Sequence, residues 1–490
     1  MQTKELIQAS TSKKLFSHGQ IMLVGLMVQS TIDLMDEGMF NVAMPAMQEA
    51  YGLPIDVLSL VVAVRYLARV GLMPIYGFVG DRFGKKRTFA AGLAIFVLGS
   101  FVSLVSPSIF WLVIGRALQG MGGGILPLAM AIISDQFSRE RRGQILGTWN
   151  ASAPAGVILG PPIGGLLIES FGWKSIFVLS GLGSLLALIL VIRLVPPTRN
   201  HQAPNTSVDW LGAAALLTLV TGLLMATTTS SVFPIGSTAN LLFWSGVGLS
   251  LAMLLWDAVK NPSPLITFDV LKNRQLMVPS IAVIFRMFAL SGTVFLMVLY
   301  LANVFNRSPQ AVGLLIIAQS LPIFLFVPIG GYLADRWTSR NAAVLGMLIQ
   351  AVGMLWLGFI DPNSNDLLLI PGMILGGLGA GLSLTPFTKG AVAALGDEQA
   401  GLAAGLYNMI RFAGAAASTP LMGLLLAAGY EKSGGLESVP EPYQIGFRIL
   451  TLCALSGAWI ASRMPVTGSI PDPDMEEEEL KDGDGTLPVL

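Results

Sequence analysis

Gly77-Phe-Val-Gly-Asp-Arg-Phe-Gly-Lys-Lys-Arg87 is a glycine-rich, basic stretch between two long apolar segments, and it decides how the chain is organised. A second copy, Gly331-Tyr-Leu-Ala-Asp-Arg-Trp-Thr-Ser-Arg340, again lies between two apolar segments. The aspartates of the two copies, Asp81 and Asp335, are 254 residues apart (335 minus 81). Six bilayer-spanning helices with their loops occupy only about 180 residues. The repeat therefore predicts two homologous six-helix halves separated by an inserted helix pair.

The composition places these helices in a membrane. Of the 490 residues, 53% are hydrophobic and 12% are charged, against about 25% charged in soluble domains, and the mean hydropathy is +0.70. Fourteen apolar windows reach the length of about 20 residues that a bilayer requires. They fall near residues 18–45, 55–79, 88–106, 109–134, 143–169, 174–195, 210–229, 240–258, 276–304, 311–333, 341–360, 366–389, 399–429 and 443–462.

The sequence thus predicts an all-α membrane protein of 14 transmembrane helices, arranged as two six-helix bundles plus two extra helices. We predict four parts along the chain. These are an N-terminal six-helix bundle (1–195), a linker with the two inserted helices (196–274), a C-terminal six-helix bundle (275–463) and an acidic cytoplasmic tail (464–490).

Lysine and arginine predict the orientation. With the N-terminus in the cytoplasm, 20 of the 29 basic residues lie on the cytoplasmic side, 5 lie within the membrane and 4 lie outside: Lys174, Arg307, Lys432 and Arg448. This distribution satisfies the rule that cytoplasmic loops are rich in positive charge. Both termini are therefore expected in the cytoplasm, in a multi-pass protein of the cell (inner) membrane. The first apolar run, about 28 residues long, exceeds the core of a signal peptide and indicates a retained helix.

Three carboxylates, Asp33, Asp36 and Glu37, lie in the first apolar window. Their spacing of i, i+3 and i+4 places them on one face of a helix, and Asn41 extends this polar face. Charged groups near the bilayer centre are costly, so such acids face a protein interior or an aqueous cavity and mark a substrate or proton path. We therefore expect this face to line a path through the protein.

Five arginines also lie within apolar windows: Arg65, Arg69, Arg116, Arg286 and Arg411. Arg65 and Arg69, at i and i+4, share one helix face. One interpretation is that they pair with the acids of the first helix, because buried charges persist only when they are neutralised and hydrogen-bonded. The alternative is a cavity with a net charge of about +2, five cations minus three acids, which would favour an anionic or zwitterionic substrate. The sequence leaves both open.

The fifth window reads Gly156-Val-Ile-Leu-Gly-Pro-Pro-Ile-Gly-Gly165. Small residues at i, i+4 and i+8 allow close contact between helix backbones. The adjacent prolines, Pro161 and Pro162, remove two helix donors and predict a kink, which suits a gate or a hinge. In the fourth window, the glycines at 122–124 are interpreted as packing notches.

Together these stretches resemble the major facilitator superfamily and, within it, the fourteen-helix drug:proton antiporter group, from about Gln20 to Arg463. The segment 77–87 is similar to the family's loop motif G-x-L-x-D-R-x-G-R-R/K. The segment 112–122 is similar to L-x-x-x-R-x-x-Q-G-x-G, and 156–165 to the antiporter motif G-x-x-x-G-P-x-x-G-G. The segment 35–45 aligns with L-D-x-T-I-V-N-V-A-L-P, which makes Asp36 the matched acid.

The resemblance implies a role for each matched residue. Asp36 would couple transport to protons, together with Arg116 and the additional acids Asp33 and Glu37. A conformational switch would use Gly77, Asp81, Arg82, Gly84, Asp335 and Arg336, although a turn with positive φ at Gly84 would explain the same loop. Export rather than uptake would follow from the antiporter motif, Gly156, Gly160, Pro161, Pro162, Gly164 and Gly165. The candidates for the substrate cavity are Asn41, Arg65, Arg69, Arg286 and Arg411; beside Arg411, Phe412 replaces the family's usual glutamine.

We therefore expect a secondary active transporter that exports small, amphipathic, drug-like molecules in exchange for protons by alternating access. One alternative is a proton-coupled transporter of an anionic or zwitterionic metabolite or lipid. A second is a transporter-like membrane sensor that moves nothing.

Other function classes have no support in the sequence. Cys453 is the single cysteine, and His18 and His201 are the two histidines, so no metal site is expected. The sequence contains no nucleophile–base set and no phosphate-binding loop, so we expect no enzyme and no cofactor, only a proton gradient as the energy source. The net charge of zero argues against nucleic acid. The expected partners are a small-molecule substrate, protons and membrane lipid, with no obligate protein partner inferred.

Overall fold

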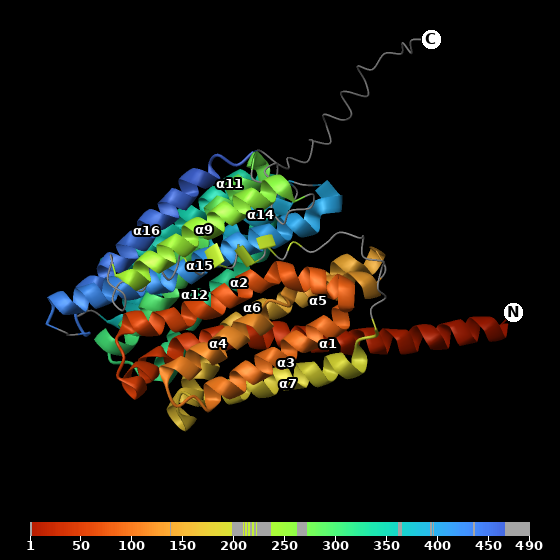
Figure 1. Ribbon diagram of the computed structural model, residues 1–490, viewed down its shortest axis with the longest axis horizontal. Helices are drawn as coiled ribbons and strands as arrows, with labels where there is room; N and C mark the ends of the chain where they lie inside the picture. The colour runs from red at the N-terminus through yellow and green to blue at the C-terminus, as the bar shows by residue number, and fades with distance from the viewer. Residues whose placement is uncertain are drawn as a thin grey trace, which may run out of the picture.

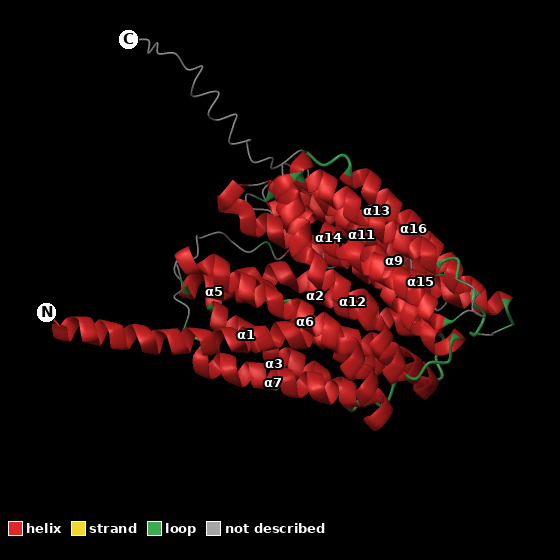
Figure 2. Ribbon diagram, turned by 180° about the vertical axis from the view of Figure 1, so that it is seen from behind, coloured by secondary structure: helices red, strands yellow, loops and turns green. Residues whose placement is uncertain are grey.

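The computed structural model is a long helical molecule (Figure 1), in agreement with the predicted all-α class. It describes residues 2–137, 139–197, 237–261, 272–360, 365–392, 394, 396–434 and 437–465, together with 209, 211, 212, 214, 215, 218, 219 and 222. Helices dominate these residues, and no strand occurs among them (Figure 2).

The N-terminal half contains α1 (Gln2–Tyr51), α2 (Ile55–Phe83), α3 (Lys85–Leu104), α4 (Ile109–Gly123), α5 (Leu126–Gln136), α6 (Arg139–Phe171) and α7 (Ser175–Leu194). One helix of the predicted inserted pair is α9 (Thr238–Lys260). The C-terminal half contains α11 (Arg274–Leu299), a π-helical turn (Tyr300–Val304), α12 (Pro309–Arg336), α13 (Ser339–Leu357), a 3₁₀ turn (Asp366–Leu368), α14 (Leu369–Val392), α15 (Gly396–Lys432) and α16 (Glu441–Ala461).

Within these described residues, thirteen of the fourteen predicted windows coincide with helices, if α4 and α5 are taken as one span. The remaining window, 210–229, falls largely outside the described residues. Eleven spans in this part of the chain are long and apolar enough to cross a membrane by length and composition. The helices α1 and α2 are not among these eleven; α1 carries Asp33, Asp36 and Glu37, and α2 carries Arg65 and Arg69.

The fourth predicted helix is divided in two. The first part, α4, ends at Gly123, and α5 begins at Leu126 with a proline in its first turn. Glycine is a poor helix former and proline lacks the N–H that a continuous helix needs, so both favour a break here. At the end of α2, Gly84 has a φ of 97°, and this single residue ends α2 and precedes α3. The predicted positive-φ turn is therefore confirmed.

The two halves meet along two helix pairs, because α2 packs against α15 and α6 packs against α12. In both views the bundles run close together at one end and diverge toward the end from which the N-terminal part of α1 projects (Figures 1 and 2). We call the end that carries the Gly84 turn and the α12–α13 turn the loop end. The opposite end, which carries the α1–α2 and α15–α16 connections, we call the far end.

Contacts between the halves close the far end. Gln48 Nε2 of α1 donates to Glu437 Oε1 at 2.6 Å, and the backbone N–H of Gln310 donates to Glu169 Oε2 at 3.2 Å. Gly165 of α6 also packs so closely on Pro309 that a Cβ atom would overlap the Pro309 carbonyl oxygen. The halves are thus joined at the far end by polar bonds and by backbone packing.

Candidate functional site

The acids of α1 lie inside the N-terminal half, on the face that the sequence predicted. Asp33 and Asp36 are fully buried, whereas the side chain of Glu37 is 25% exposed. Buried carboxylates need partners, because desolvation of an unpaired charge costs several kcal/mol. All three acids have partners on neighbouring helices.

Asp33 is held by the two arginines of α2. Arg69 Nη2 lies 2.6 Å from both carboxylate oxygens, and Arg65 Nη2 lies 2.8 Å from Oδ1 and 2.7 Å from the Asp33 carbonyl oxygen. Gly123 at the end of α4 leaves room for this group, because a Cβ atom there would lie 2.9 Å from Asp33 Oδ1 and 3.0 Å from Arg69 Nε. One carboxylate therefore neutralises part of the charge of two guanidinium groups.

Asp36 has donors from three helices. Arg116 Nη1 of α4 lies 2.6 Å from Oδ2, while Ser180 Oγ of α7 donates to Oδ1 at 2.6 Å and Gln119 Nε2 donates to Oδ1 at 3.2 Å. Arg65 Nη1 lies 3.4 Å from Oδ2, so Arg65 links Asp36 to the Asp33 group. This network stabilises a charged Asp36 in the present conformation, because every donor is directed at the carboxylate.

Arg116 is itself positioned by an aromatic ring and an amide. Its guanidinium carbon lies 3.8 Å from the centroid of the Phe40 ring, a cation–π geometry. Its Nη1 also donates to Gln119 Oε1 at 2.8 Å, and Gln119 Nε2 in turn donates to Ser100 Oγ at 2.9 Å. Arg116 thus contacts Asp36 directly and belongs to a connected chain of hydrogen bonds that reaches Ser100.

Glu37 is the most accessible acid and lies nearest the other half. Tyr66 O–H donates to Oε1, while Oε2 has no hydrogen-bond partner and lies 3.8 Å from Arg69 Nη1 and 3.9 Å from Arg65 Nη1. The Tyr66 ring stacks on Phe412 of α15 with centroids 6.3 Å apart. Glu37 therefore sits where α2 and α15 join the two halves.

The structure separates the five predicted arginines into two groups. Arg65, Arg69 and Arg116 each form an ion pair with an acid of α1, which is the internal-pairing interpretation. Arg286, in the other half, is buried and has no carboxylate partner among the described residues. Its Nε donates to the Ala380 carbonyl oxygen at 3.1 Å and to Ser383 Oγ at 3.0 Å.

Arg411 is the second cation of the C-terminal half. Its buried Nε has no hydrogen-bond partner, and its guanidinium carbon lies 4.7 Å from the centroid of the Phe412 ring. Asn41, predicted to line the cavity, is half-buried one turn beyond Glu37 and makes no hydrogen bond to the described residues. The surplus positive charge of the sequence therefore resides on α11 and α15, across the interface from the acids.

The glycines of α6 lie directly behind the acid-bearing part of α1. A Cβ atom at Gly160 would lie 2.6 Å from the Met35 carbonyl oxygen, and one at Gly164 would lie 2.7 Å from Met39 Cα. At Gly156 it would overlap the Thr31 carbonyl oxygen. The helix continues from Arg139 to Phe171 through Pro161 and Pro162 without a break.

On its other side, the same motif contacts the second half. A Cβ atom at Gly313 of α12 would overlap the Pro161 carbonyl oxygen and would lie 3.1 Å from Pro162 Cα. Together with the Gly165–Pro309 contact, this places the motif between α1 and α12. It is therefore packed both within its own half and across the interface.

The two loop motifs are only partly described. The surroundings of Gly77 and the side chain of Asp81 lie outside what the structure describes. Arg82 is exposed, with its guanidinium carbon 5.9 Å from the centroid of the Phe83 ring. In the second copy, Lys389 Nζ pairs with Asp335, and Arg336 lies 4.9 Å from the Tyr332 ring centroid. The proposed switch role of these residues stays a prediction.

The structure adds site residues that the sequence did not single out. Ser180 and Ser100 reach the Asp36 network from α7 and α3, and Tyr66 donates to Glu37. Gly123, interpreted from the sequence as a packing notch, makes space for the Asp33 pair. Serines in apolar helices commonly bond their own backbone, so Ser180 carried no signal on its own. No group of three or more metal-ligating side chains occurs among the described residues.

We expect Asp33→Asn to lower the free energy of unfolding by about 3–5 kcal/mol, because it leaves Arg65 and Arg69 buried without their anion. The matched control is Asp335→Asn, which removes a half-exposed ion pair with Lys389. That change should cost about 0–1 kcal/mol. Thermal unfolding in detergent measures both, and equal losses would contradict the assigned pairing.

The chain is similar to known membrane transporters. The family model of the Major Facilitator Superfamily matches residues 26–285 and, a second time, residues 279–478. The multidrug resistance protein Stp of Mycobacterium tuberculosis is 29% identical over 419 residues, which cover 84% of this chain and 77% of that protein. The riboflavin transporter RibZ of Clostridioides difficile is 25% identical over 393 residues, covering 80% and 84%. The crystal structure of the human organic anion transporter MFSD10 (TETRAN) has the same fold, with a TM-score of 0.62, 16% identity and coverage of 90% and 99%.

Proposed function

The chain belongs to the major facilitator superfamily, and on that premise we propose that it exports small, amphipathic, drug-like molecules in exchange for protons by alternating access. Its relatives include proteins named for multidrug resistance and drug efflux, such as Stp and the pump JefA of Mycobacterium tuberculosis. We further propose that the loop end faces the cytoplasm and that the protein resides in the cell (inner) membrane. In this orientation, the far-end contacts make the present conformation an inward-facing one.

The observation that carries the proposal is the buried Asp36 network. A fully buried carboxylate, bonded to Arg116, Gln119 and Ser180, is a group whose protonation would be sensitive to any change in helix position. A desolvated carboxylate favours its neutral form, whereas a nearby guanidinium favours its charged form. Moving α4 or α7 relative to α1 would therefore change the proton affinity of Asp36.

We propose the following cycle. In the outward-facing state, Asp36 takes up a proton as the substrate leaves. After reorientation, Arg116 and Arg65 approach the carboxylate, and the proton is displaced to the cytoplasm while a new substrate binds. Because Asp33, Asp36, Arg65 and Arg69 are linked, the proton and the substrate need not occupy the same atoms to exclude each other.

The test is transport in reconstituted vesicles with an imposed pH gradient. Uptake of a lipophilic fluorescent amine into inside-out vesicles should follow the gradient and stop when a protonophore collapses it. Gradient-independent flux would overturn proton exchange. An absence of flux over a broad panel of cationic, neutral and anionic compounds would favour the sensor alternative.

A second candidate function is transport of an anionic or zwitterionic substrate. It is favoured by Arg286 and Arg411, two cations without carboxylate partners in the described part of the C-terminal half. An anionic group at the interface could approach Arg411, whereas a cationic group would be repelled from α15 and attracted toward Glu37. The two candidates therefore predict different substrate orientations.

Arg411→Gln separates the two candidates. If the substrate is anionic, we expect its affinity to fall by roughly 10-fold or more, because a buried charged hydrogen bond is lost. If the substrate is cationic, its affinity should stay the same or rise, because the variant removes the repulsion between the Arg411 charge and the substrate. The measurement is proton release from detergent-solubilised protein on addition of ligands of each charge type. Arg448→Gln, at an exposed site on α16, serves as the control.

A further inference from the structure

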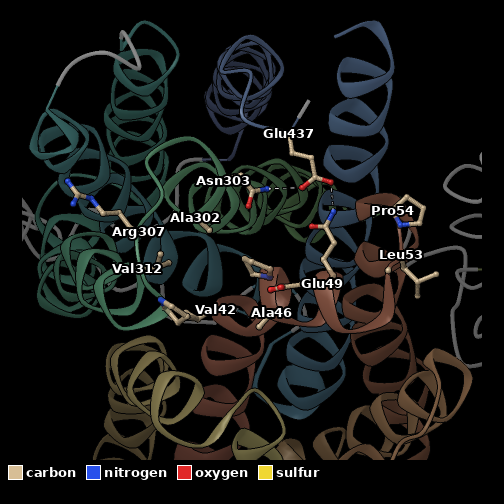
Figure 3. A pocket seen from close by; sticks show the side chains of 14 residues that line it. Val42, Ala46, Glu49, Leu53, Pro54, Ala302, Asn303, Arg307, Val312 and Glu437 are labelled. Carbon is tan, nitrogen blue, oxygen red and sulfur yellow. Dashed lines mark hydrogen bonds between the residues drawn. The ribbon is translucent and has the colours of Figure 1, made fainter. Parts of the chain in front are cut away.

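A cavity of about 790 Å³ lies between the two halves at the far end (Figure 3). Its N-terminal-half wall includes Gln48, Glu49 and Pro54, and its C-terminal-half wall includes Asn303, Arg307 and Glu437. This volume is typical of a small-molecule site. Because the cavity lies between the halves, a substrate released at the far end in the proposed cycle would pass it.

Glu437 spans the cavity between the halves. Its Oε1 accepts from Gln48 Nε2 at 2.6 Å, and its Oε2 accepts from Asn303 Nδ2 at 3.3 Å (Figure 3). Gln48 belongs to α1, whereas Asn303 lies in the π-helical turn after α11. The short bond to Gln48 is the one that crosses between the halves.

The Glu437 segment is fixed to its own half from behind. Tyr443 O–H donates to the Glu437 carbonyl oxygen at 3.4 Å, Asn303 Nδ2 lies 3.3 Å from the Tyr443 hydroxyl, and the hydroxyls of Tyr430 and Tyr443 are 2.6 Å apart. Asn303, Tyr430 and Tyr443 all belong to the C-terminal half. Separation of the halves at the far end would therefore break the Gln48 bond and leave the contacts of the Glu437 segment within its own half intact.

We propose that Glu437 and Gln48 form a latch that holds the far end closed and that must release in each transport cycle. The proposal rests on the proposed alternating-access function, because only a protein that opens at the far end needs to break this bond. Gln48 and Glu437 lie outside every motif that the resemblance supplies. The latch is thus a property of this chain's own residues.

The latch should respond to pH. Burial raises the pKa of Glu437, partly opposed by the hydrogen bond from Gln48. The other titratable groups facing it are Glu49 and Arg307 across the cavity and the phenols of Tyr430 and Tyr443 behind it. Opening would hydrate the carboxyl and return its pKa toward the ordinary value, so protons bind more tightly to the closed state. Low pH therefore favours closure, and a rise of pH through the raised pKa favours opening.

The test measures the far-end distance directly. Spin labels at the exposed positions Ala50 and Lys432, introduced as Ala50→Cys and Lys432→Cys in a Cys453→Ser background, report separation of α1 from α15 in lipid nanodiscs. We expect Glu437→Ala and Gln48→Ala each to raise the ratio of long-distance to short-distance populations by about 10-fold, the loss of one charge-assisted hydrogen bond. The double variant should show no further increase, because both changes remove the same bond.

Glu49→Ala is the matched control, since Glu49 lines the same cavity and makes no hydrogen bond to the described residues. Glu437→Gln should keep the far end closed, because an amide can also accept from Gln48, and should remove the part of the pH dependence due to the carboxyl. Unchanged distances in Glu437→Ala, or an equal shift in Glu49→Ala, would overturn the latch. The distances require no flux, so a failure of the proposed transport function would appear separately, as absent transport with an intact latch response.

Discussion

We expect Asp36→Asn to abolish the exchange of protons for substrate in reconstituted vesicles. The amide has nearly the shape of the carboxylate but cannot take up or release a proton in the cycle. It also leaves Arg116 buried at 2.6 Å from a neutral group. The whole coupling between proton and substrate should therefore be lost, which for coupled sites is worth up to about 100-fold in affinity. The measurement is substrate-driven proton flux followed with a pH-sensitive dye.

Asp257→Asn is the control for this change. Asp257 is also a buried acid in an apolar helix, but it lies on α9 and accepts a hydrogen bond from Asn261 at 3.1 Å, outside both halves. Asp257→Asn should therefore leave the coupling between proton and substrate unchanged. Ligand binding to detergent-solubilised Asp36→Asn then separates a coupling defect from unfolding: binding should persist without proton release. Normal proton exchange in Asp36→Asn would remove Asp36 from the mechanism.

The charged residues of the site could be found from the sequence because charged side chains are rare in apolar, membrane-spanning segments. An acid or arginine in an apolar window is costly, and the i, i+3 and i+4 spacing of Asp33, Asp36 and Glu37 fixes their shared face. The spacing does not determine which arginine meets which acid. The pairing depends on how α1, α2 and α4 pack. In the structure Asp33 pairs with Arg69, and Asp36 pairs with Arg116.

Polar residues with ordinary alternatives could not be found in this way. Ser180 bonds Asp36 across 144 positions of sequence, and a serine in an apolar helix can equally bond its own backbone. Gln48 lies near the end of α1 and Glu437 lies in the connection between α15 and α16. Polar residues are usual at such positions and carry no information about their partners. The division of the fourth predicted helix at Gly123 could not be predicted either, because glycines in membrane helices also serve as packing contacts.

The antiporter motif, residues 156–165, makes two kinds of contact: contacts with α1 of its own half and contacts with the other half. Gly156, Gly160 and Gly164 pack on α1 in the same half, whereas Gly165 packs on Pro309 of the other half. In the proposed alternating-access cycle, contacts within a half would persist, whereas contacts between the halves at the far end would exist only while that end is closed. The first three glycines should therefore matter for folding and the fourth for the balance between conformations.

We expect Gly160→Ala to destabilise the protein by about 1–3 kcal/mol and to stop transport, because the new methyl group meets the backbone of Met35 at 2.6 Å and α1 must move away. Gly165→Ala should instead keep its thermal stability and raise the far-end-open population, since its clash with Pro309 is relieved when the halves separate. Gly248→Ala on α9 is the control: beyond its own helix, no described residue has an atom within 4 Å of a Cβ placed there, so the added methyl should be tolerated. Thermal unfolding and the Ala50–Lys432 spin-label distance measure the two effects. Far-end closure and helix packing are thus separate properties of one motif. Any influence of the motif on the direction of transport is expected to act through Pro161, Pro162 and Gly165, which contact α12. An equal loss of stability in Gly160→Ala and Gly165→Ala would contradict this division.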